Sequence, residues 1–546
     1  MRWQDAAAAK QQAIWTDVPP AWHIDEAAAT NARGGDVQTL IRLSTNAAEL
    51  QIVDRGGVEL LELLSRGNVS AQEVIAAFSH RAVLAHQSVR VPSHLPNRQR
   101  ASVLTSHHLQ TLCLCENNWL AAHKQARELD TYWRNHRKPV GPLHGLPVSV
   151  MDRFHIAGLD SACGFIDWLG NKRTAQDEGT LVRILRSLGA VIHCKTNVPV
   201  SLMLGETVNN VIGTTVNPYN LELSAGGACG GEGALGALRG SALGFGTDVA
   251  GSSRIPPAFC GLYALKCSEH RLCADGIATV LTGLPAAGGS IGLISNDADL
   301  LPLAFESILD YGHVPADPNV LPLPWRQPLV NGIRARKGSS SKSDGRLVFG
   351  YMAHDGHVRP HPPLQRALDV VVDCLRKSGH EVIEWKPPPH APAVKTLFQI
   401  LGSTSGVEVR TALNASGEPV IPQLQDWYQN QDMEPSSSSE FWALCAAREQ
   451  YQTQYKAYWN SVGATTRSGR TPDGVILPVA PTLAVRPREF SYYGYSAIAN
   501  ALDYPSGVFP VTTGDSNLDL PLGNLDYLSD IDKTVQQSCK LIFYTG

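Results

Sequence analysis

A serine in the most glycine-dense part of the chain has surroundings that suit acyl-transfer chemistry. The region runs Ser224-Ala-Gly-Gly-Ala-Cys-Gly-Gly-Glu232 and resumes as Gly244-Phe-Gly-Thr-Asp-Val-Ala-Gly-Ser252-Ser-Arg254. Glycine allows tight turns that other residues avoid, and such turns expose backbone N–H groups. N–H groups beside a serine are the elements of an oxyanion hole, which stabilises the negative charge that forms when a carbonyl is attacked. The run therefore favours a serine placed next to an oxyanion hole.

Other interpretations of these residues are weaker. Neither the phosphate-loop pattern Gly-x-x-x-x-Gly-Lys-Ser/Thr nor a clean Gly-x-Gly-x-x-Gly after a strand is present. The hydrolase nucleophile elbow Gly-x-Ser-x-Gly is absent from this glycine-rich run too. Cys113 and Cys115 have no second pair at zinc-site spacing, and His354, His357 and His361 fall in a predicted loop. We therefore expect no metal and no cofactor.

Several motifs together resemble the amidase signature family. The glycine-rich region is similar to the family pattern Gly-Gly-Ser-Ser-Gly-Gly-Glu, followed by Gly-Thr-Asp-x-Gly-Gly-Ser-x-Arg-x-Pro. Upstream, the run Gly141-Pro-Leu-His-Gly-Leu-Pro-Val-Ser-Val-Met151-Asp152 resembles a stretch that ends Val-Ser-Leu-Lys-Asp in the family. The resemblance extends to about Val511. It is nearest to the fungal acetamidase-like branch, through residues 141–147, 195–199, 217–220 and 502–505.

The resemblance implies a fold and a set of residue roles. The fold is α/β, a single large α/β/α domain with a mixed central sheet covered by helices. Family members use a Ser–cisSer–Lys triad, in which lysine acts through a serine that follows a cis peptide bond and so activates the nucleophile. The nucleophile corresponds to Ser252. The oxyanion donors correspond to backbone N–H groups of Val249, Ala250, Gly251 and Ser252, flanked by the retained Asp248 and Arg254.

The other two triad positions depart from the family. The lysine position is Met151 and the bridging serine position is Ala228. Methionine keeps the length and much of the volume of lysine but has no nitrogen that could take a proton. Hydrolysis by the usual relay is therefore expected to be weak or lost.

Three neighbouring positions carry further expectations. Cys229 follows the missing serine and is a candidate for a substitute relay, although a lone buried cysteine is more often inert. The cis peptide bond of the family corresponds to Gly227–Ala228. Because the bridging serine that follows this bond in the family is absent here, a trans bond is an alternative. Ala250 replaces the first glycine of Gly-Gly-Ser, and its methyl group would be costly if the turn needs φ > 0 there or if the substrate approaches this position closely.

The elements that must position these residues alternate as in α/β proteins. A helix is predicted over residues 181–188 and a strand over 190–194; a second helix is predicted over 363–378 and a second strand over 381–385. Residues 474–478 form another buried-strand candidate. Helix–Gly–strand units of this kind favour a parallel or mixed sheet that is covered on both faces.

We divide the chain into five stretches. Residues 1–87 form the N-terminal helical part of the domain, 88–112 an unpatterned insertion and 113–330 the signature core. Residues 331–345 read as a linker-like loop. Residues 346–546 form the C-terminal half of the same domain, in which the family's last strand and helix are not recognisable.

Composition limits the choice of partners. With 43% hydrophobic and 18% charged residues and a net charge of −4, nothing suggests nucleic acid or an anionic membrane as a partner. No apolar run approaches the ~20 residues that span a bilayer. The start lacks the apolar core of a signal peptide, and an odd number of scattered cysteines argues against a disulfide framework. We expect a reduced, cytoplasmic protein that binds a small-molecule amide or ester; homo-oligomer formation stays open.

Three functions remain as hypotheses. The first is an amidase by descent that forms an acyl-enzyme on Ser252, with weak or lost activity. The second is a non-catalytic binding protein that keeps the amide pocket. The third, a glutaminase subunit of an amidotransferase, is disfavoured by the resemblance of the N-terminal helices to the acetamidase branch.

Overall fold

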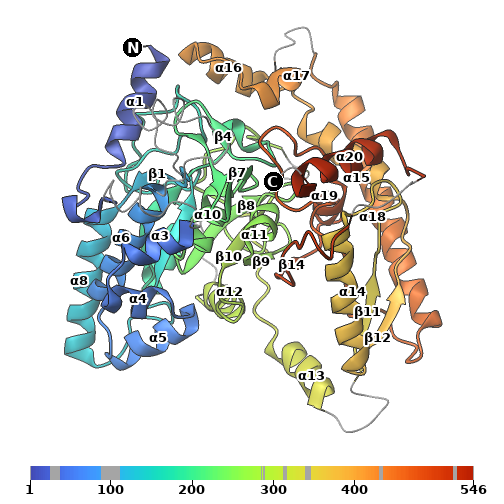
Figure 1. Cartoon of the computed structure of the whole chain (residues 1–546), viewed down its shortest axis with the longest axis horizontal. Helices are drawn as coiled ribbons and strands as arrows, with labels where there is room; N and C mark the ends of the chain where they lie inside the picture. The colour runs from blue at the N-terminus through green and yellow to red at the C-terminus, as the bar shows by residue number, and fades with distance from the viewer. Residues whose placement is uncertain are drawn as a thin grey trace.

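A mixed sheet at the centre of the molecule carries the candidate site. The computed structural model describes residues 2–24, 37–87, 111–284, 286, 289–311, 317–338, 346–428, 434–520 and 526–544 (Figure 1). The main sheet has seven strands in the order β1-β3-β2-β8-β10-β9-β14. They are β1 (Leu114–Asn117), β2 (Pro147–Met151), β3 (Val191–Thr196), β8 (Leu243–Asp248), β9 (Tyr263–Lys266), β10 (Ser290–Ser295) and β14 (Ser506–Val508).

The three central strands are parallel and the outer ones antiparallel. β2 pairs in parallel with both β3 and β8, whereas β1 pairs antiparallel with β3. β10 runs antiparallel to β8 and β9, and β14 antiparallel to β9. Every residue of β2, β3 and β8 is buried, which requires cover on both faces. The predicted α/β fold with a mixed central sheet is confirmed.

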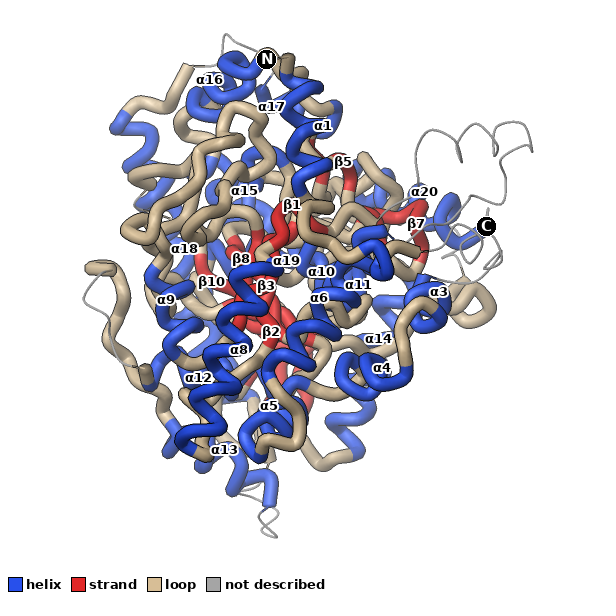
Figure 2. The backbone as a smooth tube through the Cα atoms, turned by 90° about the vertical axis from the view of Figure 1, so that its left-hand side faces the viewer, coloured by secondary structure: helices blue, strands red, loops and turns tan. Residues whose placement is uncertain are grey.

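Helices pack against this sheet (Figure 2). α10 (Gly230–Ala237) contacts β2, β3 and β8, and α6 (Ala71–Gln87) packs on α10 and on α8 (Trp119–His136). The remaining helices of this half are α1 (Trp3–Ala13), α3 (Val37–Leu43), α4 (Ala47–Val53), α5 (Gly57–Arg66), α9 (Thr180–Ser187), α11 (Ile255–Cys260) and α12 (Leu300–Asp310).

The C-terminal half has a small sheet and a hydrophobic cluster of its own. β11 (Val348–Tyr351) lies between β12 (Glu381–Glu384) and β13 (Gly474–Ile476), and both pairings are parallel. α15 (His390–Leu401) packs on α18 (Ser438–Val462) and α19 (Gly494–Ala501). Their apolar residues form a cluster that includes Leu397, Ile400 and Ile498, and also Ala250 from the other half. The other helices here are α14 (Pro362–Lys377), α16 (Val407–Ser416), α17 (Gln425–Tyr428) and α20 (Asp530–Tyr544).

The predicted helices over 181–188 and 363–378 are confirmed by α9 and α14, and the predicted strands by β3, β12 and β13. The linker-like loop is wrong for residues 331–338, because α13 (Gln327–Gly338) covers them. Its Pro328 stands at the start of the helix and its basic residues stand toward the end, both of which suit a helix. The basic residues of this stretch up to residue 337 therefore belong to a helix, and residues 339–345 lie outside the described part of the chain.

The insertion predicted over 88–112 lies outside the described residues from 88 to 110. Its last residues are part of the fold: Thr111 is buried, and its hydroxyl donates to the Ala85 carbonyl at 2.5 Å. At the other end of the chain, α20 packs on the loop before α14, where the Arg359 N–H donates to Asp532 at 3.0 Å. That the family's last strand and helix are missing stays a prediction. Within the described ranges, no helix has both the length and the apolarity to cross a membrane.

Candidate active site

The turn that follows β8 is built around one buried carboxylate. Asp248, the last residue of β8, accepts hydrogen bonds from the Gly251 N–H at 2.7 Å, the Ser253 N–H at 3.1 Å and the Arg254 guanidinium at 2.9 and 3.0 Å. Asn500 of α19 donates to the same carboxylate at 3.0 Å. Burial alone would raise the pKa of Asp248, but Arg254 holds it well below its usual range. The charged carboxylate thus fixes the shape of the turn.

Backbone N–H groups of this turn are free to bind a developing oxyanion. No described residue accepts a hydrogen bond from the N–H of Ala250 or of Ser252. The Gly251 N–H is different, because it is already bound to Asp248. Gly251 has φ 128°, and a Cβ there would lie 2.6 Å from Ser496, so glycine is required. Ala250 has no positive φ, so its methyl group causes no backbone strain; whether it hinders a close approach of the substrate stays a prediction.

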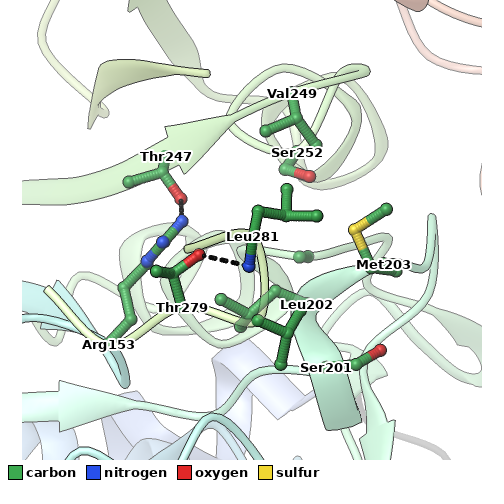
Figure 3. Close-up of a pocket in the computed structure, with 11 residues that line it drawn as sticks. Arg153, Ser201, Leu202, Met203, Thr247, Val249, Ser252, Thr279 and Leu281 are labelled. Carbon is green, nitrogen blue, oxygen red and sulfur yellow. Dashed lines mark hydrogen bonds between the residues drawn. The ribbon is translucent and has the colours of Figure 1, made fainter. Parts of the chain in front are cut away.

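Ser252 lines a small cavity together with Ala228 and Arg153 (Figure 3). The cavity itself is narrow, and the about 310 Å³ of empty space around its lining includes open solvent. Ser252 is 9% exposed, and its hydroxyl makes no hydrogen bond with a described residue. The other lining residues are Ser201, Leu202, Met203, Thr247, Val249, Thr279, Val280 and Leu281.

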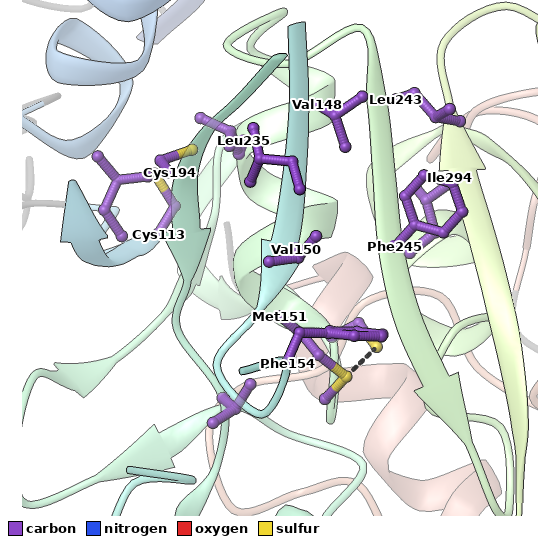
Figure 4. Packing of buried hydrophobic residues seen from close by; sticks show 14 of the residues in the cluster. Cys113, Val148, Val150, Met151, Phe154, Cys194, Leu235, Leu243, Phe245 and Ile294 are labelled. Atoms are coloured by element: carbon purple, nitrogen blue, oxygen red, sulfur yellow. Dashed lines mark hydrogen bonds between the residues drawn. The ribbon is translucent and has the colours of Figure 1, made fainter. Parts of the chain in front are cut away.

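Met151 occupies the end of β2 with its thioether deep in the protein (Figure 4). Its side chain is fully buried, and its Sδ accepts hydrogen bonds from the Thr247 N–H at 3.0 Å and the Thr247 hydroxyl at 3.3 Å. The Cys229 Sγ lies 3.8 Å from the same sulfur. A thioether accepts hydrogen bonds weakly and cannot be protonated near neutral pH. The position therefore holds a packed acceptor in place of a base.

Ala228 presents a methyl group to the cavity in the place of the family's bridging serine. The Gly227–Ala228 peptide bond is cis, so the trans alternative raised from the sequence is wrong. No hydroxyl at this position links Ser252 to Met151. The structure thus brings Ser252, Ala228 and Met151 to one place without a hydrogen-bonded relay between them.

Cys229 is unsuited to replace the relay. It is fully buried, its Sγ donates to the Thr247 carbonyl at 3.6 Å, and its N–H donates to the Ser252 carbonyl at 3.2 Å. Burial raises the pKa of the Cys229 thiol well above its usual value, and the nearby Glu232 and Asp248 raise it further. A thiol that stays protonated at neutral pH offers no base to Ser252.

A buried carboxyl group lies beneath the site, where sequence reasoning assigned it no role. Glu232 of α10 accepts from the Ser149 hydroxyl at 2.5 Å and from the Thr196 hydroxyl at 2.9 Å. Burial raises the pKa of Glu232 to about 8, although these two hydrogen bonds lower it. Its partners belong to β2 and β3, so the carboxyl joins α10 to the sheet and does not contact Ser252.

Arg153 is a cavity residue that sequence reasoning missed. Its Nε donates to the Ala278 carbonyl at 3.0 Å and its Nη1 to the Thr247 hydroxyl at 2.8 Å. The side chain is 7% exposed, and burial lowers the pKa of its guanidinium. In the sequence, the feature that could have identified Arg153 is its position two residues after Met151, which places it beside the site.

Lys195, the nearest lysine in a motif shared with the family, lies outside the cavity. Lys195 is fully buried in β3, where its Nζ pairs with Asp152 at 2.9 Å and donates to the Ser161 hydroxyl at 3.1 Å and to the Asp160 carbonyl. It is not among the residues that line the cavity. These contacts hold Lys195 in the sheet, which is a structural role.

Metal-ligating side chains gather away from the cavity. Among the described residues, the one group within ligand distance is Cys273, Asp275 and Asp317. Both carboxylates already accept hydrogen bonds, from Thr180 at 2.5 Å and from the Ala274 N–H at 2.9 Å. The three histidines of the 354–361 loop do not form such a group; His361 is buried against the Val535 carbonyl of α20 at 2.8 Å.

Comparisons with known proteins agree with this geometry. The family model described as Amidase matches residues 103–526. An acetamidase of Aspergillus oryzae is 37% identical over 537 residues, which cover 98% of this chain and 92% of that protein. An acetamidase of Emericella nidulans is 36% identical over 100% of this chain and 93% of its own length.

A solved structure of fatty acid amide hydrolase superposes with a TM-score of 0.84 at 26% identity, over 98% of this chain and 89% of that one. The family match covers more than half of the sequence, and the fungal relatives span nearly all of it. By sequence and by fold, the chain belongs to the amidase family.

Proposed function

We propose that the Ser252 cavity binds a small or medium carboxamide or ester, and that hydrolysis through an acyl-enzyme on Ser252 is weak. One observation carries the proposal: the Ser252 hydroxyl lines the cavity without a hydrogen-bonded base, while a thioether stands at the lysine position. Serine hydrolases that lack triad members keep roughly 10³–10⁴-fold acceleration from the oxyanion hole and binding alone. Activity of that order is the expectation for this chain.

The chemistry follows from the groups present. The Ser252 Oγ attacks the carbonyl carbon, and the N–H groups of Ala250 and Ser252 hold the resulting oxyanion. The proton of the hydroxyl must pass to water, because Met151 cannot accept it. The same deficit slows protonation of the leaving amine when the C–N bond breaks, and water then hydrolyses the acyl-enzyme. The proton transfers therefore limit the rate.

A non-catalytic binding protein is the second candidate. The observation that favours it is the character of the cavity, where Leu202, Met203, Val249 and Leu281 supply apolar walls around a serine without a base. Such a cavity can retain a ligand that it does not cleave. The fungal acetamidase relatives support either of these candidates over a glutaminase subunit.

Ammonia release from a panel of simple amides tests the proposal. The purified protein and its Ser252→Ala variant are assayed side by side, with ligand binding followed by calorimetry. We expect slow release that depends on Ser252. Turnover within ~100-fold of an intact acetamidase, a difference of about 2.7 kcal/mol in the barrier, would contradict the missing-relay view. Binding without any Ser252-dependent release would favour the second candidate.

A further inference from the structure

The cavity contains a buried positive charge that the protein does not neutralise. Arg153 uses its Nε and one N–H of Nη1 to bind the Ala278 carbonyl and the Thr247 hydroxyl. Its remaining N–H groups, including both on Nη2, have no acceptor among the described residues, and no described carboxylate forms an ion pair with it. Arg153 itself lines the cavity (Figure 3).

Other buried cations nearby are paired. Arg254 contacts the Asp248 carboxylate with two nitrogens, and Lys195 pairs with Asp152. The groups that favour the charge of Arg153 are the Cys163 and Cys229 thiols, which burial keeps protonated. A guanidinium does not deprotonate in proteins, and a buried charge without a partner is costly. A ligand that brings a negative charge would remove this cost.

The position of Arg153 fixes where such a charge would lie. Thr247 joins Arg153 to the site, because its hydroxyl accepts from Arg153 and donates to the Met151 sulfur. The free edge of the guanidinium therefore shares the cavity with Ser252 and the oxyanion turn. The space in front of these groups is narrow, which favours a ligand with a short chain.

We propose that the cavity takes a short ligand that carries a carboxylate as well as an amide or ester, with the carboxylate bound by Arg153. The half-amide of a small dicarboxylic acid has this chemistry. Arg153 donates to the carboxylate with its free N–H groups, and the amide carbonyl lies toward Ser252. The inference rests on the proposed function, since it names the ligand class of the same cavity.

A pair of matched ligands tests the carboxylate. Succinamate carries one carboxylate and one carboxamide, and succinamide is its neutral counterpart of nearly the same shape. Calorimetry on the unmodified protein should give at least ~10-fold tighter binding of succinamate, the range expected for a charge-assisted bidentate contact. Equal affinities would overturn the carboxylate inference and leave the proposed function standing. No binding of either ligand would also overturn the carboxylate inference, and the release of ammonia from the amide panel then decides the proposed function separately.

Variants assign the preference to Arg153. Arg153→Met should abolish the preference for succinamate over succinamide, and Arg153→Lys should keep part of it. Lys172→Gln, which removes an exposed positive charge from the same part of the chain, should change neither affinity. A preference that survives in Arg153→Met would overturn the assignment. If Arg153→Met fails to fold, Arg153→Lys and the ligand pair on the unmodified protein still decide the matter.

Discussion

Ser252 should react only weakly with a fluorophosphonate probe at neutral pH. Such probes require a nucleophile activated by a base, and the Ser252 hydroxyl has none among the described residues. Labelling is measured by mass spectrometry, with Ser252→Ala as the control and an intact acetamidase as the reference. Strong labelling that disappears in Ser252→Ala would mean that another group has taken over as the base.

Restoring the triad should require both missing groups. Met151→Lys places an amine where the thioether now accepts from Thr247, and burial lowers the pKa of such an amine. Ala228→Ser alone adds a hydroxyl with nothing to take its proton. The double variant should exceed either single variant by at least ~10-fold in amide turnover, because relay members act as a unit.

Outcomes of this repair have distinct meanings. Recovery in the double variant indicates an intact scaffold with a silenced triad. A folded double variant without activity indicates a cavity remodelled for binding, and the charge of Arg153 is then the first feature to examine. Circular dichroism and thermal melting of each variant separate this outcome from misfolding.

At the residue scale, the resemblance to the family assigned Ser252, Met151 and Ala228 to one site. In the structure, Ser252 and Ala228 line the same cavity, and Met151 is hydrogen-bonded to Thr247 of that cavity. The resemblance could not locate Arg153. An arginine two residues after a strand end is usually solvated, and only the packing of the Ala278 carbonyl and Thr247 around it keeps it in the cavity. The identity of its neighbours depends on contacts that are far apart in the sequence.

At the element scale, Glu232 makes the attachment of α10 to the sheet sensitive to pH. The pKa of Glu232 is about 8, above the usual 4.5, so the folded state favours the protonated form. The contribution of Glu232 to stability is fully present below the pKa that glutamate has in the unfolded chain. It is lost as pH rises through the pKa of Glu232 in the folded protein. Thermal stability should therefore fall between about pH 5 and pH 9.

Glu232→Gln should remove much of this pH dependence. The amide is neutral at every pH and can still hydrogen-bond to the Ser149 and Thr196 hydroxyls. The melting temperature of the variant should exceed that of the unmodified protein above pH 8, with a smaller difference or the reverse order at pH 5. Parallel melting curves for the two proteins across pH would count against a protonated Glu232.

α19 holds the oxyanion turn from the other half of the molecule. Asn500 donates to the Asp248 backbone carbonyl and carboxylate, each at 3.0 Å, and accepts from Arg254 at 2.6 Å. Asn500→Ala leaves buried groups unpaired and should cost about 1–3 kcal/mol of unfolding free energy. Asn460→Ala, an exposed position on α18, is the control in denaturant unfolding and should cost much less.

Several elements could be predicted because their periodicity is local, as in α9, α14, β3 and β12. The second sheet and the helical state of residues 331–338 could not. The strands of the second sheet, β11, β12 and β13, are joined by long connections. No short-range pattern in the sequence therefore shows that they form a sheet separate from the main one. α13 exposes its apolar Leu329 and Ile333, so no amphipathic pattern distinguished it from a loop.

At the scale of the whole molecule, residues 88–110 should be dispensable for folding. Their composition offers no apolar face to bury, and the chain on either side is already joined, since Thr111 hydrogen-bonds to Ala85 near the end of α6. Replacing them with a short Gly/Ser linker should change the melting temperature little. Thr111→Val, which keeps the volume but loses the buried hydrogen bond, should cost about 1 kcal/mol. Loss of soluble protein in the linker variant would place the replaced segment within the fold.

The carboxylate of Asp248 is satisfied by the turn itself, by Arg254 and by Asn500, and none of these contacts involves Met151 or Ala228. The residues that fix the shape of the turn are therefore different from those at the family's lysine and bridging-serine positions. Substitutions at the Met151 and Ala228 positions can therefore change the reactivity of Ser252 while the contacts that shape the turn are kept. The same independence gives an engineer a preassembled turn beside which the groups at the Met151 and Ala228 positions can be exchanged together.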